Sequence, residues 1–335
     1  MLIIPYFIQH RGCPHRCLFC NQKAIAGTET SADIEPEDDL RDCVERWLGR
    51  SKAKENIQVA FFGGSFTCLD QTLQGRLLEG VQPYIRAGRV NSIRLSTRPD
   101  CLSQDICEFL LSYGVRTVEL GVQSMAEAVL QQSNRGHSSE DSRKALRLLT
   151  SYHFEVGVQL MPGLPGETTN SFLKGVRDII SLQPNFVRLY PTLVIKHTEL
   201  AELYEKTSWK PLDMNKAVTL CRRAVDLFSE QGIRVIRLGL QPSVELESQV
   251  IAGPYHPAFA ELVFGRRWYL RTRKLLSEAG PEKSLTMTIS DRDYSTFVGL
   301  KKQNINRLRT LPFGGHLVIE TDKSLERGQF RHVIS

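Results

Sequence analysis

The sequence predicts an α/β protein built on a parallel sheet or barrel and followed by a small α+β appendix. Short apolar runs rich in β-branched residues recur along the chain, and segments with the periodicity of amphipathic helices separate them. Such runs are typical of parallel strands buried on both faces, and repeated strand–helix units with tight turns indicate an open or closed barrel. A change of texture after about Gly253 predicts the appendix.

The expected strands of the barrel recur at intervals up to the joint with the appendix. They are residues 2–8, 57–62, 92–96, 117–122, 155–160, 186–190 and 235–238. Amphipathic helices are expected at 40–48 and 142–152, with a shorter one at 176–182. In barrels of this kind the chemistry collects on loops at the carboxyl ends of the strands, so polar residues at those ends are the candidate site.

A turn-rich joint at residues 253–257 divides the chain into an expected core domain, 1–257, and an expected appendix, 258–335. The appendix has the pattern of two helices and two strands. In chain order these are a basic amphipathic helix at 259–276, a strand at 285–289, a helix at 294–308 and a strand at 317–320.

Length and composition favour a folded cytoplasmic protein. With 335 residues and 41% hydrophobic content, the chain can bury a full core. It has no apolar run of about 18 residues, and its start lacks the features of a signal peptide, so we expect no membrane contact. Eight cysteines without an even framework of spacings favour reduced thiols or metal ligands over structural disulfides.

The net charge of +6 lies entirely in the appendix, where 14 Lys and Arg face 8 Asp and Glu. Its first helix interleaves cations with aromatic residues, and further cations follow. The cations are Arg266, Arg267, Arg271, Arg273, Lys274, Lys301, Lys302, Arg307 and Arg309, and the aromatics are Trp268 and Tyr269. Arginines can meet phosphates while aromatics stack on bases, which favours RNA. A basic helix docked on its own barrel has the same composition.

Cys13, Cys17 and Cys20 lie in one short loop directly after the first expected strand. Three thiolates are one ligand fewer than a closed 4Fe–4S or structural zinc site needs. The remaining iron of such a cluster can chelate the amino and carboxylate groups of S-adenosylmethionine (SAM), and an electron passed to the sulfonium can release a 5′-deoxyadenosyl radical. A zinc site completed by His15 or a distant residue is the alternative.

Polar or glycine-rich turns follow several other expected strands. Gly63 and Gly64 let the backbone approach a ligand closely and expose carbonyls to an ammonium group. Arg135 can pair with a carboxylate through two parallel hydrogen bonds. Taken singly, each feature also fits an ordinary turn, cap or surface charge. Their recurrence at successive strand ends favours an active-site rim.

The remaining cysteines divide into two groups. Cys43, Cys107 and Cys221 fall in helical patterns and are expected to be buried small hydrophobes. Cys68 and Cys101 lie just beyond the second and third strands, where a catalytic thiol is one interpretation.

In order along the chain, these motifs resemble the radical SAM half of the Elongator catalytic subunit. The resemblance covers about residues 5–250, with a looser likeness to oxygen-independent coproporphyrinogen oxidases. It rests on Gly63-Gly64-Ser65-Phe66, Thr97-Arg98-Pro99-Asp100, Glu119-Leu120-Gly121-Val122-Gln123-Ser124, Asn134-Arg135-Gly136-His137 and Tyr190-Pro191-Thr192-Leu193-Val194-Ile195.

The resemblance implies a partial (β/α)6 radical SAM barrel that binds a 4Fe–4S cluster and SAM. It further implies tRNA as substrate and a reductant such as flavodoxin or ferredoxin as partner. By motif, Cys13, Cys17 and Cys20 would hold the cluster, Gly63, Gly64 and Ser65 the SAM amino end, Arg135 its carboxylate, and Gln123 and Gln159 its ribose or adenosine side. Ser96 stands where related enzymes often carry a Glu for the sugar.

Two departures from the Elongator pattern limit what the resemblance implies. The first two cluster cysteines are closer together than in the Elongator enzymes, at the spacing typical of the wider radical SAM group. The appendix is also shorter than their acetyltransferase domain and shows no recognisable acetyl-CoA loop. The carboxymethylation of wobble uridine is therefore not transferred to this chain.

The expected function is a radical SAM transferase that modifies a tRNA nucleoside. One alternative is a small-molecule or tetrapyrrole-like carboxylate substrate, held by Arg188, Arg234 and Arg237 near the late strands. A second alternative is a non-catalytic iron–sulfur binding protein. The sequence assigns no catalytic residue, and it offers only Tyr190, Thr192, Cys68 and Cys101 as candidate hydrogen donors or acceptors.

Overall fold

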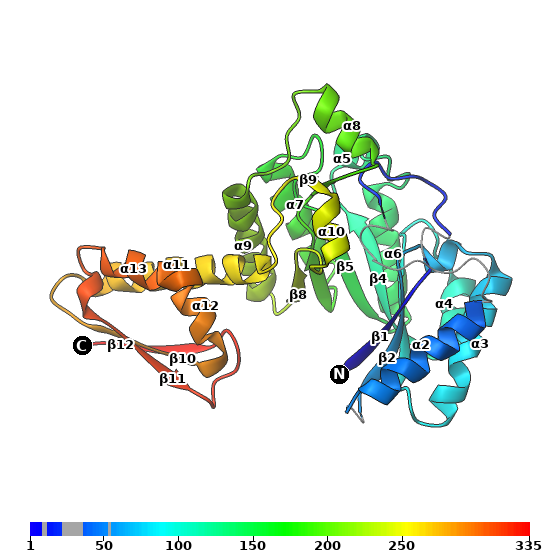
Figure 1. The fold of residues 1–335 in the computed structure, drawn as a ribbon, viewed down its shortest axis with the longest axis horizontal. Helices are drawn as coiled ribbons and strands as arrows, with labels where there is room; N and C mark the ends of the chain where they lie inside the picture. The colour runs from blue at the N-terminus through cyan, green and yellow to red at the C-terminus, as the bar shows by residue number, and fades with distance from the viewer. Residues whose placement is uncertain (9–11, 22–35, 53–54) are drawn as a thin grey trace. The chain divides into compact units, whose positions relative to one another are not determined.

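The computed structural model describes residues 1–8, 12–21, 36–52 and 55–335 (Figure 1). Over these residues the chain forms two compact units. The first comprises Met1–Asp213 and Ala224–Tyr255, and the second comprises Met214–Arg223 and His256–Ser335. The helix α9 (Met214–Glu230) therefore contributes its first turns to the second unit and its remainder to the first.

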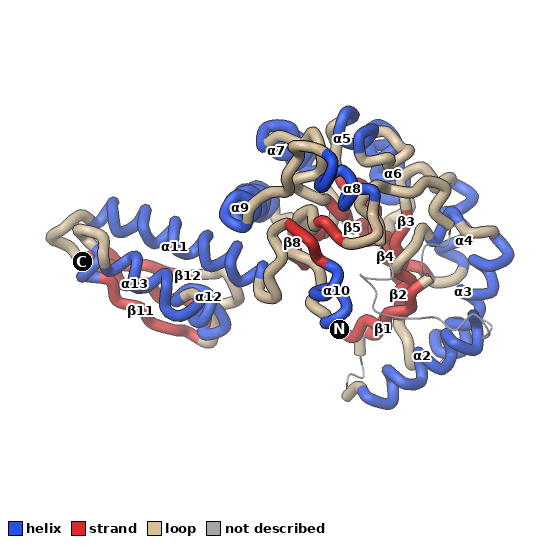
Figure 2. Tube along the Cα trace, turned by 45° about the horizontal axis from the view of Figure 1, so that its top comes forward, coloured by secondary structure: helices blue, strands red, loops and turns tan. Residues whose placement is uncertain are grey.

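A seven-stranded parallel sheet forms the frame of the first unit, with the strands in the order β1-β2-β3-β4-β5-β6-β8. Figure 2 shows these strands inside an arc of helices. The strands are β1 (Leu2–Phe7), β2 (Ile57–Phe62), β3 (Ser92–Thr97), β4 (Val115–Gln123), β5 (Glu155–Leu160), β6 (Phe186–Leu189) and β8 (Arg234–Leu238). The predicted α/β partial barrel is thus confirmed, with every expected strand in place.

Helices connect successive strands, as parallel pairing requires. They are α2 (Pro36–Arg50), α3 (Gln71–Arg86), α4 (Gln104–Ser112), α5 (Glu127–Gln132), α6 (Ser139–Ser151), α7 (Thr169–Ser181) and α8 (Glu199–Lys206) with α9; α10 (Val244–Gln249) follows β8. The start of α6 is set by a capping box, in which Ser138 and Asp141 satisfy each other's backbone N–H groups. A short antiparallel pair, β7 (Val194–Ile195) with β9 (Val250–Ala252), completes the unit.

The strands carry apolar residues toward the helices and polar residues on the opposite face. Val118 and Leu120 of β4 are fully buried among apolar neighbours, whereas Glu119 between them belongs to the polar face. Gly157 of β5 lies on this face beside Phe186, whose ring carbon Cε2 would be 2.2 Å from a Cβ at position 157. A barrel with a polar interior follows from this alternation.

The second unit packs helices on one face of a three-stranded sheet, and the predicted α+β pattern is observed. Its elements are α11 (Phe259–Ala279), β10 (Leu285–Ser290), α12 (Tyr294–Val298), α13 (Gln303–Arg309), β11 (Leu317–Asp322) and β12 (Phe330–Ile334). The prediction of a single helix at 294–308 is wrong. Gly299, Lys301 and Lys302 all adopt positive φ and separate α12 from α13. β12 was not predicted.

Within the described ranges, no helix combines the length and the apolar character needed to cross a lipid bilayer.

Candidate active site

The cysteine loop lies against the turn that follows β2. Gly12 adopts a φ of +78°, and a Cβ there would stand 2.3 Å from the carbonyl oxygen of Ser65, so only glycine fits. Further along the loop, the N–H of Leu18 donates to Ser133 O at 3.2 Å and its carbonyl accepts from Leu200 N at 2.8 Å. Three distant segments of the chain therefore position the loop.

The three predicted cluster ligands share this loop but differ in exposure. Cys13 is exposed, Cys17 is buried and Cys20 is half-buried. Burial raises the pKa of Cys20 to about 12 and also raises the pKa of Cys13, and the nearby Cys17 thiol raises both further. The three sulfurs are thus near enough to repel one another as thiolates.

Three cysteine donors fit a 4Fe–4S cluster in type and number, with one iron left open. In such a cluster each thiolate binds a different iron, so the sulfurs do not meet at a single point. Among the residues that the structure describes, no three His, Cys, Asp or Glu side chains converge on one metal ion. His15, which the zinc interpretation invoked, packs its ring on Gly136.

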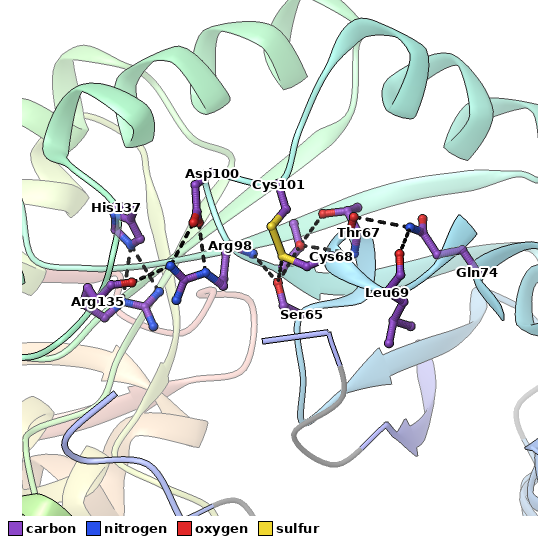
Figure 3. Close-up of a disulfide and its surroundings, with 11 residues drawn as sticks. Ser65, Thr67, Cys68, Leu69, Gln74, Arg98, Asp100, Cys101, Arg135 and His137 are labelled. Carbon is purple, nitrogen blue, oxygen red and sulfur yellow. Dashed lines mark hydrogen bonds and ion pairs between the residues drawn. A yellow bond between two sulfur atoms is a disulfide. The ribbon is translucent and has the colours of Figure 1, made fainter. Parts of the chain in front are cut away.

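The predicted Gly-Gly-Ser turn directly follows β2, and its serine is hydrogen-bonded to residues at the end of β3 (Figure 3). Ser65 is buried; its hydroxyl accepts from Arg98 N at 3.1 Å and shares a 3.2 Å hydrogen bond with Thr97 Oγ1. This side chain is therefore engaged within the protein. Gly63, with a φ of +82°, and Gly64 remain half-buried, so their backbone is the part of the turn open to a ligand.

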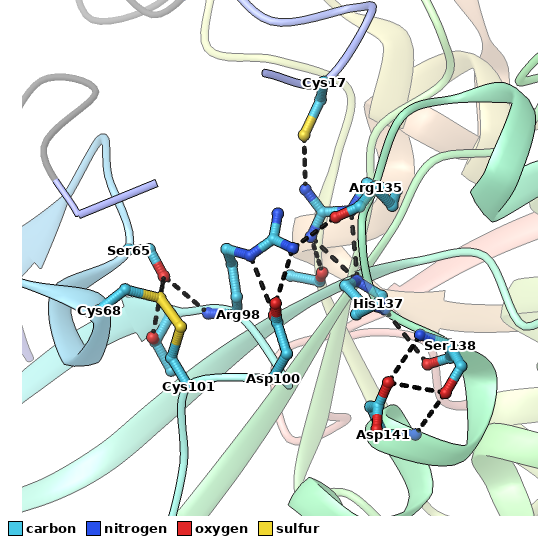
Figure 4. Close-up of polar contacts among 12 residues, drawn as sticks. Cys17, Ser65, Cys68, Arg98, Asp100, Cys101, Arg135, His137, Ser138 and Asp141 are labelled. Carbon is cyan, nitrogen blue, oxygen red and sulfur yellow. Dashed lines mark hydrogen bonds and ion pairs between the residues drawn. A yellow bond between two sulfur atoms is a disulfide. The ribbon is translucent and has the colours of Figure 1, made fainter. Parts of the chain in front are cut away.

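Arg135, predicted to bind a carboxylate, is buried beside the cysteine loop (Figure 4). Its Nη1 donates to Cys17 Sγ at 2.9 Å, its Nη2 donates to the carbonyl of Gly121, and its Nε donates to His137 Nε2 at 3.3 Å. Burial, followed by the charge of Arg135, lowers the pKa of His137 to about 4, so the ring is neutral at pH 7 and can accept. The guanidinium is thus held by the protein itself.

Arg98, to which the sequence assigned no role, lies at the centre of this site. Its Nε and Nη2 donate to the two carboxylate oxygens of Asp100 at 3.0 and 2.9 Å, and Nη2 also donates to the carbonyl of Arg135. Nη1 is buried and has no hydrogen-bond partner among the described residues. The two N–H groups of Arg98 Nη1 are therefore available to bind an anion. The position of Arg98 directly after a strand could have indicated it.

The two predicted glutamines occupy different places. Gln123 ends β4 with a φ of +68°, its Nε2 faces the region of Gly121 and Arg135, and its buried Oε1 has no hydrogen-bond partner among the described residues. Gln159 instead donates to Glu119 Oε2 at 3.1 Å inside the barrel. The structure therefore brings Gln123, but not Gln159, to the arginines of the site.

An ion-pair network fills the barrel interior around Glu119, which is fully buried. Arg94 Nη1 and Arg188 Nε each lie 2.8 Å from its carboxylate, and Arg188 Nη1 donates to the Tyr190 hydroxyl at 3.3 Å. Arg234, mostly exposed, lies 3.7 Å from Glu155. Two of the three arginines proposed for a carboxylate substrate are thus already paired with carboxylates of the protein.

A disulfide joins Cys68 and Cys101, contrary to the expectation of reduced thiols (Figure 3). The neighbouring parallel strands β2 and β3 end at the same edge, which brings the two Cα atoms to 5.4 Å. Neither residue carries a free thiol in this state, so the catalytic-thiol interpretation does not hold for it. Cys107 and Cys221 are fully buried, as predicted, and Cys43 is half-buried.

We expect Cys68→Ser to destabilise the oxidised protein. The disulfide closes a loop of 33 residues, for which the chain-entropy relation gives about 3–4 kcal/mol of stabilisation. Denaturant unfolding of the cluster-free protein would measure this loss, and Cys43→Ser serves as the control. With a thiol reductant the variant and the wild type should unfold alike. Equal stability without reductant would contradict the prediction.

The fold and the site together define a class of protein: a barrel enzyme with a cofactor site at the carboxyl ends of its strands. Comparison with known families identifies the family. Residues 7–179 match the radical SAM superfamily, and residues 184–267 match the radical SAM C-terminal domain. The chain belongs to the radical SAM superfamily, as the sequence motifs predicted. It is accordingly an enzyme, with a 4Fe–4S cluster and SAM as cofactors.

Individual relatives include the tRNA uridine(34) acetyltransferase of Methanocaldococcus infernus, which is 29% identical over 62% of this chain and 46% of its own length. Elongator complex protein 3 of Schizosaccharomyces pombe is 28% identical over 58% of this chain and 40% of its own length. The chain thus spans less than half the length of each of these two relatives.

Solved structures show the same fold. The archaeal M. infernus Elp3 has a TM-score of 0.64 and 23% identity, over 82% of this chain and 63% of that one. Coproporphyrinogen III oxidase (HemN) from Escherichia coli has a TM-score of 0.51 and 18% identity, over 69% and 53% of the two chains.

Proposed function

We propose that this enzyme holds its cluster on Cys13, Cys17 and Cys20, cleaves SAM to a 5′-deoxyadenosyl radical and thereby modifies a nucleoside in tRNA. One observation carries the proposal: the hydrogen bond from Arg135 to Cys17 connects the cysteine loop to the segment between α5 and α6. When bound, the cluster supplies the electron that breaks a C–S bond of SAM. The remaining chemistry is positioning by this chain's own residues.

The geometry suggests a revised set of SAM contacts. The backbone carbonyls at Gly63 and Gly64 would receive the ammonium group, because the Ser65 hydroxyl is engaged elsewhere. Arg98 Nη1 would bind the carboxylate, since it has an open N–H pair whereas Arg135 is occupied. Gln123 Oε1 would accept from a ribose hydroxyl. In this proposal Arg135 positions the cysteine loop and Gln159 orients Glu119.

The tRNA substrate is supported by the name of the M. infernus relative, a tRNA uridine(34) acetyltransferase. Because the chain spans about half of that protein or less, we propose only the substrate class and leave the transferred group open. We also propose that the two compact units correspond to a catalytic core and an accessory domain, with the boundary near residue 257.

Two measurements test the proposed function. The protein is reconstituted anaerobically with iron and sulfide and reduced by flavodoxin or dithionite, and the formation of 5′-deoxyadenosine from SAM is then followed. Mass spectrometry of tRNA nucleosides from a strain lacking the gene, compared with its parent, tests the substrate. A protein that binds only zinc and releases no deoxyadenosine would end the proposal. Identical nucleosides in the two strains would remove tRNA as the substrate.

A further inference from the structure

Trp268 and Tyr269 of the second unit do not form a surface for base stacking, contrary to one interpretation of the sequence. Trp268 and Tyr269 are only 5% and 6% exposed and belong to the core between α11 and the sheet. Arg271 lies 4.7 Å from the Phe330 ring centroid and 5.4 Å from that of Trp268. An RNA contact of α11 therefore depends on its cations and not on these two rings.

Several of those cations are already neutralised by carboxylates of the same unit. Arg327 lies 3.2 Å from Glu261 and 3.3 Å from Asp293. Lys274 lies 3.8 Å from Glu278. Arg327 and Lys274 are therefore neutralised within the unit.

Arg266 and Arg307 are held in a different way. Arg266 donates to Asn215 Oδ1 at 2.9 Å and to Thr219 Oγ1 at 3.2 Å. These neutral oxygens orient the guanidinium without cancelling its charge. The Arg307 guanidinium lies 4.2 Å from the Tyr269 ring centroid, a cation–π contact that also preserves the charge. Both side chains are thus fixed in place as full cations.

Arg307 and Arg266 lie near each other, because the Tyr269 ring that Arg307 contacts is one helical turn from Arg266 on α11. Burial lowers the pKa of Arg266, and the charges of Arg307 and Arg222 lower it further, with no carboxylate contributing. Cations gathered in this way repel each other, and a bound anion relieves the repulsion. Arg266 lies on α11 and Arg307 on α13, both in the second unit.

Building on the proposed tRNA substrate, we infer that Arg266 and Arg307 form a docking site for the phosphodiester backbone of RNA. Guanidinium groups match phosphate oxygens in geometry and charge. An extended polyanion fits this site better than a small anion, because further cations lie close to Arg307 in the sequence. Lys301, Lys302 and Arg309 are exposed there and form no ion pair in the described part of the chain.

The test measures the affinity of the full chain for a fluorescent tRNA transcript over a series of salt concentrations. The variant Arg266→Gln/Arg307→Gln removes both cations of the site. Because each phosphate contact contributes about one to the slope of log K against log salt, this slope should fall by about two, and affinity at ~0.1 M salt by about tenfold or more. Lys323→Gln, an exposed cation between β11 and β12, should bind like the wild type.

Further variants and outcomes separate docking from folding. Arg307→Lys keeps the charge and should retain most of the affinity, and thermal midpoints identify any misfolded variant. A double variant with wild-type affinity and slope would overturn the docking site alone. An equal loss in Lys323→Gln would do the same. A wild type that cleaves SAM but binds no RNA would remove the tRNA substrate as well. Binding to phosphatidylserine vesicles instead of RNA would assign the surface to a membrane and overturn the inference.

Discussion

Replacing any one of Cys13, Cys17 and Cys20 by alanine is expected to reduce deoxyadenosine formation to the level of a protein-free control. A cluster held by three thiolates has no spare protein ligand, so losing one opens a second iron and makes the cluster labile. Of the loop residues that the structure describes, His15 is not free to replace a lost thiolate, because its ring packs on Gly136. Iron and sulfide content should fall together with the rate.

The controls for this prediction are cysteines outside the loop. Cys221→Ser changes a fully buried thiol in α9, and Cys43→Ser changes a half-buried one in α2. Both variants should keep the iron content of the wild type. If a loop variant retained both its cluster and its rate, the ligand assignment would be wrong, whatever the substrate proves to be.

Glu119→Gln is expected to destabilise the barrel by about 3–5 kcal/mol, because it leaves buried charges uncompensated. The carboxylate is fully buried and lies within 2.8 Å of both Arg94 and Arg188, of which Arg94 is also nearly inaccessible. A glutamine has the same shape but cannot balance the two guanidinium charges. Urea unfolding of the cluster-free protein measures the loss of unfolding free energy.

Glu155→Gln is the matched control for this measurement. Glu155 also belongs to the barrel network, but its side chain is 32% exposed and it lies 3.7 Å from Arg94 and from Arg234. Its removal should cost less than about 1 kcal/mol, as for other solvent-screened pairs. If the two variants lost the same stability, the barrel interior would have to be more hydrated than its burial indicates.

Local patterns were enough to predict the elements of the barrel. Each strand is a short run rich in β-branched residues, and each helix has an amphipathic period. Both patterns are contained within the short segment that forms the element. The exceptions come from single residues. Gly299, followed by Lys301 and Lys302 at positive φ, breaks a helix whose apolar period continues across the break. β12 is half-exposed to exposed along its length, so its residues carry little hydrophobic pattern.

The sequence could predict which segments line the site but not which polar atoms are occupied. Ser65, Arg135 and Gln159 all carry suitable groups, and each is engaged by a residue far away in the chain. Arg98 and Gln123 are chemically similar to them, yet each keeps a buried polar atom without a partner among the described residues. Whether such a polar atom has a hydrogen-bond partner depends on neighbours from other strands, which only the register of the sheet brings close.

By itself, the sequence determined the fold class, the radical SAM motifs and the three-cysteine loop, because these depend on spacing within short segments. Only the tertiary structure decided that Cys68 and Cys101 pair, that Trp268 and Tyr269 are buried, and that Arg266 and Arg307 keep their charge. Each of these results depends on distances between residues separated along the chain. The packing of the folded chain sets these distances, and they cannot be predicted from the sequence pattern of any one segment.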